Sequence, residues 1–142
     1  MMRKPMTDKK KIARLVFVFD AKSGKLGAWV DSAKKALMMK GCALCTITHG
    51  ILGEKSEWQD CKAQIGVPVD YFHRDDMPSP VAEVASKLLP CVVAQLEDGS
   101  HELLVGPDVL DRCKGSVADL KSRLFIRALA QNMDLPEVII EA

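Results

Sequence analysis

Hydrophobic and polar positions follow two periods along the first half of the chain, one typical of strands and one typical of helices. The run Arg14-Leu15-Val16-Phe17-Val18-Phe19-Asp20 is continuously apolar between charged ends, which is typical of a strand buried on both faces of a parallel sheet. Apolar residues then recur at helical spacing over 25–39, and a second helix is predicted over 54–64. Residues 67–73 alternate between apolar and polar, which predicts a second strand.

The second half of the chain is organised around a predicted β-hairpin. Pro90 opens an apolar run, Asp98-Gly99 closes it, and a second apolar run follows. Asp-Gly between two such runs supplies the positive φ that a tight turn needs. Ser116 is a good N-cap for the final helix. Helices are predicted before the hairpin over 80–88 and after it from about 108 and over 116–130.

These elements predict one α/β domain. The first two strands are joined by helical segments and should therefore be parallel, while the hairpin adds two antiparallel strands. We expect a single mixed sheet of four strands with helices on both faces. The domain is expected over 12–130, with a flexible basic tail over 1–11 and a C-terminal tail over 131–142.

Composition restricts the class of protein. A chain of 142 residues that is 48% hydrophobic is long enough to bury the core of one domain. Its 20 basic and 19 acidic side chains nearly cancel, which argues against nucleic-acid binding driven by charge. The apolar runs fall short of the roughly 20 residues of a membrane span, and the basic N-terminus has no signal-peptide pattern. We therefore expect a cytoplasmic protein that binds neither nucleic acid nor membranes.

The apolar run Leu89-Pro90-Cys91-Val92-Val93, the Asp98-Gly99 turn and the terminal helix resemble the thioredoxin superfamily over roughly 14–130. The resemblance implies a thioredoxin-like fold in which Pro90 is cis and faces the active site. Other segments are similar to a small group of thioredoxin-like bacterial proteins. They are Cys42-Ala43-Leu44-Cys45 with Thr48, His49 and Gly50, then Trp58, and Phe72-His73-Arg74-Asp75.

The Cys-x-x-Cys pair departs from the thioredoxin arrangement. In that superfamily the pair lies between the first strand and the first helix, where the helix N-terminus stabilises a thiolate. Here 20–24 contains no cysteine, and Cys42 follows about twenty residues later. A helix of about 15 residues carries the chain roughly 22 Å. We therefore expect Cys42 near the opposite end of the sheet from Pro90, with Cys45 and His49 part-way back.

Three interpretations of Cys42 and Cys45 remain open. Their spacing suits a redox pair, with Cys42 as the nucleophile by order and a protein partner or thiol substrate; this interpretation requires no cofactor. The same thiols suit a soft metal, zinc or copper, with His49 and Cys61 as further ligands. Cys42 and Cys45 could also be ordinary buried residues of the hydrophobic core, because free cysteine is often buried. The odd total of five cysteines argues against a purely structural set of disulfides.

A second group of polar residues is expected at the end of the sheet where the parallel strands finish. Ligands of open α/β sheets bind beyond the carboxyl ends of the strands, and free N–H groups after Ser23 could hold an anion. A solvated loop is the simpler interpretation of 20–24. A noncatalytic module that presents this end, or the hairpin, to a protein partner is the alternative to redox function. The group consists of Asp20, Ser23, His73, Asp75 and Pro90.

Overall fold

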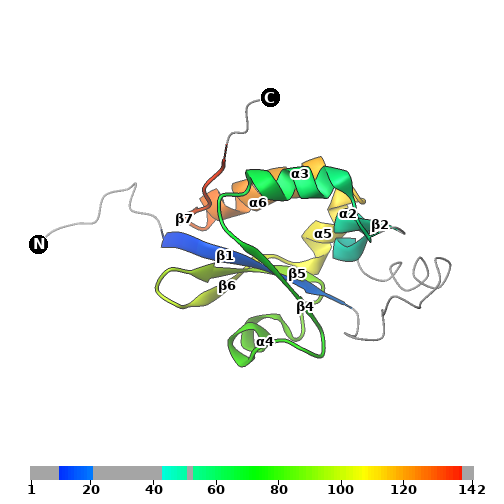
Figure 1. The fold of residues 1–142 in the computed structure, drawn as a ribbon. Coiled ribbons are helices and arrows are strands. Elements are labelled where there is room, and N and C mark those ends of the chain that lie inside the picture. The colour runs from blue at the N-terminus through cyan, green and yellow to red at the C-terminus, as the bar shows by residue number, and fades with distance from the viewer. Residues whose placement is uncertain (1–9, 21–42, 51–52, 139–142) are drawn as a thin grey trace, which may run out of the picture.

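The computed structural model describes residues 10–20, 43–50 and 53–138 (Figure 1). The predicted helix over 25–39 lies outside these residues. The strands of the main sheet are β1 (Lys10–Phe19), β4 (Val69–His73), β5 (Cys91–Leu96), β6 (His101–Val105) and β7 (Met133–Asp134). A separate short pair comprises β2 (His49–Gly50) and β3 (Gly53–Glu54). The helices are α2 (Ala43–Thr48), α3 (Ser56–Gln64), α4 (Ser79–Ala85), α5 (Pro107–Cys113) and α6 (Val117–Ala130).

The main sheet is mixed, as predicted, but it has five strands rather than four. Its order is β4-β1-β5-β6, with β1 parallel to β4 and the other neighbours antiparallel. The fifth strand, β7, pairs in parallel with Lys10 and Lys11 at the start of β1. The prediction of four strands is wrong because β7 is two residues long, too short for alternation of apolar and polar residues to reveal it.

Alternate residues of β1 lie on opposite faces of the sheet, and different helices cover the two faces. Leu15, Phe17 and Phe19 belong to the core beneath α2, α3, α5 and α6, whereas Val16 and Val18 belong to a smaller core beneath α4. Figure 1 shows the four helices on one side of the sheet and α4 on the other. We call these sides the four-helix face and the α4 face.

The predicted hairpin is present as β5 and β6. Gly99 has a φ of +92°, which favours glycine, and the backbone N–H of Leu96 donates to the carbonyl of Ser100 at 2.8 Å. The carboxylate of Asp98 accepts hydrogen bonds from the backbone N–H and the hydroxyl of Ser100. The Leu89–Pro90 peptide bond before the hairpin is cis, as the resemblance implies.

The segment after α6 returns to the domain. Beyond β7, Leu135 is buried, and the carbonyl of Pro136 accepts a hydrogen bond of 2.8 Å from the backbone N–H of Gly66. A Cβ added to Gly66 would meet Pro136 at 2.9 Å, so this close approach needs glycine. Residues 133–138 therefore lie along the end of α3 and the start of β1.

Candidate functional site

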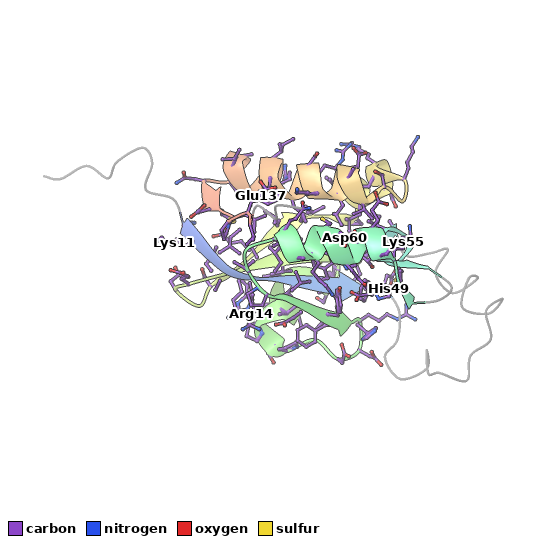
Figure 2. All side chains as sticks on the ribbon, turned by 45° about the horizontal axis from the view of Figure 1, so that its top comes forward. Lys11, Arg14, His49, Lys55, Asp60 and Glu137 are labelled. Atoms are coloured by element: carbon purple, nitrogen blue, oxygen red, sulfur yellow. The ribbon has the colours of Figure 1, made fainter. Side chains whose placement is uncertain are left out.

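The chain from α2 to β3 packs at the carboxyl end of β1. The ring of His49 lies edge-on to that of Phe19, the last residue of β1, with centroids 5.5 Å apart. Val18 pairs with Cys91, the residue after Pro90, so Pro90 lies at the same end of the sheet. Figure 2 shows His49 there, with Lys11 and Arg14 toward the amino end of β1. His49 therefore lies at this end rather than part-way along the sheet.

Cys45 lies in the first turn of α2. The helix begins at Ala43, the residue after Cys42, and Cys42 itself is outside the described residues. Cys45 is 8% exposed, belongs to the core of the four-helix face, and is disulfide-bonded. The other three described cysteines are free thiols. Helix α2 packs against α5, which follows the carboxyl end of β6, so Cys45 too belongs to the Pro90 end.

Hydrogen bonds fix the proton arrangement of His49. The hydroxyl of Thr48 has one hydrogen and donates it to the carbonyl of Leu44 at 3.0 Å. The same oxygen lies 2.6 Å from Nδ1 of His49 and therefore accepts the hydrogen of that nitrogen. In the neutral ring, Nε2 then carries the lone pair. The Thr48 hydroxyl thus links the ring of His49 to the backbone of α2.

A polar network attaches the β2–β3 pair to the sheet and to α3. His49 and Glu54 are opposite each other in that pair. The carboxylate of Glu54 accepts hydrogen bonds from the hydroxyl of Tyr71 on β4 and from Nζ of Lys62 on α3, the latter at 2.7 Å. The Tyr71 hydroxyl accepts in turn from Nε1 of Trp58 at 2.8 Å and from Lys62 at 3.1 Å. Its single donor and both its acceptor positions are therefore used.

Hydrogen bonds within the network shift the pKa values of its members. Burial acts to raise the pKa of Glu54, but the hydrogen bonds from Lys62 and Tyr71 outweigh it and hold that pKa below its usual value. Burial acts to lower the pKa of Lys62, but its hydrogen bonds to Glu54 and Tyr71 raise it. Burial and the hydrogen bond to Glu54 both raise the pKa of Tyr71. At neutral pH the network therefore consists of a carboxylate, an ammonium and a neutral phenol.

The second predicted group lies partly at the same end. His73 ends β4, its ring is tilted against Phe19 at 5.9 Å, and its Nδ1 lies 3.1 Å from the carboxylate of Asp76. Asp20 pairs with Arg74 at 3.5 Å. Asp75 lies in the turn that follows β4, and Ser23 lies outside the described residues. The structure therefore gathers Asp20, His73 and His49 around the end of β1.

The three free thiols are buried in the cores. Burial raises the pKa of Cys61 and of Cys113, and it raises the pKa of Cys91 to about 12. These thiols remain protonated at neutral pH and are poor nucleophiles. In the described part of the chain, no three side chains of His, Cys, Asp or Glu gather as the ligands of a metal ion would. Cys61, the predicted fourth ligand, lies in α3.

Sequence reasoning missed the Glu54–Tyr71–Lys62 network. Tyr71 is the only tyrosine of the chain, and it falls within a predicted strand. Glu54 stands beside a glycine at the start of the helix predicted over 54–64, whereas the structure places it in β3. Neither position carries a sequence signal for a shared hydrogen bond, since the contact joins residues 17 apart on β3 and β4.

Comparison of the chain with protein-family models, curated proteins and solved structures gives no match. None of the helices in the described ranges has the length and apolar composition that crossing a bilayer requires.

Proposed function

We propose that this protein is a thioredoxin-like thiol–disulfide oxidoreductase in which Cys42 and Cys45 form the reactive pair. The observation that carries the proposal is the disulfide of Cys45, alongside three free and buried thiols. A sulfur already in a disulfide is not a thiolate ligand, so the same observation favours redox chemistry over a metal site. The mixed sheet, with two parallel strands followed by a hairpin and a terminal helix, supports the thioredoxin-like assignment.

The location of α2 also supports the proposal. Cys45 and His49 lie at the carboxyl end of β1, where the chain also places Pro90, and ligands of open α/β sheets bind at this end. The polar network of Glu54 and Tyr71 holds the β2–β3 pair, and with it the end of α2, against the sheet. The displaced Cys-x-x-Cys segment is thus compatible with chemistry beside Pro90.

The burial of Cys45 supports different roles for the two sulfurs in the proposed reaction. Cys42 attacks the disulfide of a substrate as a thiolate, which breaks the substrate S–S bond and leaves a mixed disulfide and one substrate thiolate. Cys45 then attacks the sulfur of Cys42, closing the Cys42–Cys45 disulfide and releasing the second substrate thiolate, and both released thiolates take up protons. Two electrons pass to the substrate. Cys45, at 8% exposure, suits this second, internal attack.

A redox titration in glutathione buffers tests the proposal, with alkylation and mass measurement of the intact protein. We expect two thiols to disappear together at a single potential, within the range of about −120 to −270 mV seen for such pairs. Cys42→Ser and Cys45→Ser should each abolish that transition. Cys113→Ala is the matched control, because it removes a buried free thiol and should leave the transition unchanged.

Two results would contradict the proposal, and each would favour another function. Native Cys42 and Cys45 that resist both reduction and alkylation would leave the noncatalytic binding module as the function. Zinc or copper found by elemental analysis at one ion per chain, lost in Cys42→Ser and in His49→Gln, would assign the pair to a metal site.

A further inference from the structure

A groove of about 380 Å³ lies between α5 and α6. Its volume falls within the range of about 300–1,000 Å³ that is usual for ligand sites. The lining mixes apolar and strongly basic side chains. Val109 and Arg112 come from α5, and Arg123, Ile126 and Arg127 come from α6.

The groove carries an excess of positive charge. Three arginines line it against one carboxylate, that of Asp119. Asp119 lies 4.0 Å from Arg123, at the outer limit of an ion pair. Within the described ranges, Arg112 and Arg127 have no ion-pair partner. Neighbouring guanidinium groups repel one another, so an anionic partner would be attracted to this site.

Arg127 is held in place before any partner binds, and Arg123 is partly buried. Nε of Arg123 is buried, and in the described part of the chain it has no hydrogen-bond partner. Nε of Arg127 donates to the carbonyl of Leu104 at 3.2 Å. A side chain that is already fixed loses less conformational entropy when it binds, which favours affinity.

An exposed apolar side chain lies beside these charges. Ile126 is 61% exposed on α6, between Arg123 and Arg127 in sequence, and it lines the groove with Val109. Burial of an exposed isoleucine contributes to association, whereas a free inorganic anion would leave it in water. The lining therefore fits a partner that offers both carboxylates and an apolar side chain.

We propose that the α5–α6 groove is a docking site for an acidic amphipathic segment of a partner protein. The carboxylates of the segment contact Arg112, Arg123 and Arg127, and a neighbouring apolar side chain packs on Ile126. Arginine suits this role because its planar guanidinium binds carboxylates through two parallel hydrogen bonds. The described lining of the groove contains none of the residues proposed for thiol–disulfide exchange.

Fluorescence anisotropy tests the proposal with the full chain and a labelled synthetic peptide in which glutamates flank a leucine on both sides. We expect saturable binding that weakens as salt is added. Arg112→Gln should raise the Kd about tenfold, as loss of a charge-assisted contact would. Lys87→Gln is the matched control: it removes one exposed cation outside the groove, next to α4, and should leave the Kd unchanged.

The apolar part of the site has its own pair of variants. Ile126→Ser should raise the Kd, whereas Leu129→Ser, which alters a residue of equal exposure on the same helix outside the groove, should not. Circular dichroism and the urea midpoint check that each variant is folded. Equal binding of a peptide with glutamine in place of glutamate would overturn the proposal, and so would an absence of binding at millimolar peptide. Displacement of the peptide by inorganic phosphate at equal concentration would overturn it in favour of a small-anion site.

Discussion

The four-helix face and the α4 face of the sheet differ in what they bury. On the four-helix face, large side chains such as Phe17 and Trp58 pack together, and polar atoms of Tyr71 and Glu54 complete a hydrogen-bonded network beside them. On the α4 face the core is small, and its buried side chains are valine, alanine and cysteine. Because β1 alternates between the two faces, one strand supplies both environments.

The two faces also differ in the environment that they give to cysteine. Cys45, with its disulfide, belongs to the four-helix face, and His49 contacts Phe19 of the same core. Cys91 is fully buried on the α4 face, where burial alone raises its pKa to about 12. Two cysteines thus lie near the same end of β1, one in a disulfide and the other as a protonated free thiol. Substitutions on each face test whether this division is real.

The largest effect is expected from Trp58→Ala on the four-helix face. Trp58 is fully buried, its ring lies 5.1 Å from that of Phe17, and its Nε1 donates to Tyr71. Removal of the indole leaves a cavity and deprives the phenol of a donor, so the free energy of unfolding should fall by about 3–5 kcal/mol. Urea unfolding measures this as a lower midpoint with an unchanged slope.

Leu129→Ala controls for the general cost of shortening a side chain. Leu129 is 61% exposed on α6, so its change should be within about 0.5 kcal/mol of zero. A loss of less than about 1 kcal/mol for Trp58→Ala would show that the aromatic core is not the main source of stability on this face.

A smaller effect is expected from Cys91→Ser on the α4 face. The substitution nearly conserves volume but places a hydroxyl among Val16, Val18 and Val93 in a fully apolar core. Burial of an unsatisfied hydroxyl should cost about 1–3 kcal/mol. Cys91→Ala, which buries no polar group, should be the more stable of the two variants in urea. The reverse order would mean that this core holds a polar partner or water.

Sequence patterns predicted elements that local signals specify. The run 14–20 marks most of β1, Asp98-Gly99 marks the hairpin, and Ser116 caps α6 by accepting from the backbone N–H of Asp119 at 3.1 Å. Each signal lies within a few residues of the feature that it specifies. The fold class could therefore be predicted from the sequence.

The location of the candidate site could not be predicted in the same way. Helix α2 has only six residues, too few to show a clear helical period, and β7 has two. The position of His49 depends on its contact with Phe19, thirty residues earlier. The position of the β2–β3 pair depends on the hydrogen bond between Glu54 and Tyr71. Such contacts arise from packing, so counting residues along a helix placed Cys45 and His49 incorrectly.

The smallest effect is a dependence on pH that only the four-helix face should show. The pKa of Glu54 is lower in the folded protein than the ordinary pKa of a glutamate, because of the hydrogen bonds from Lys62 and Tyr71. A carboxyl group with a lowered pKa stabilises the fold above its unfolded pKa, and this contribution is lost as the pH falls through the folded pKa. Glu54→Gln removes the charge that Lys62 and Tyr71 stabilise, at a cost of about 1 kcal/mol near pH 7.

Urea unfolding of the wild type and Glu54→Gln between pH 7 and pH 3 measures this contribution. The two free energies of unfolding should differ near neutrality and converge as the pH falls through the lowered pKa of folded Glu54, because protonated Glu54 no longer attracts Lys62. Hydrogen bonds from Ser100 also lower the pKa of Asp98, but Asp98 titrates in both proteins and its contribution cancels from the difference. Cys91→Ser, on the α4 face, should instead differ from the wild type by the same amount at every pH in this range. Parallel curves for Glu54→Gln would mean that the network holds the β2–β3 pair by hydrogen-bond geometry alone, without a contribution from its charge.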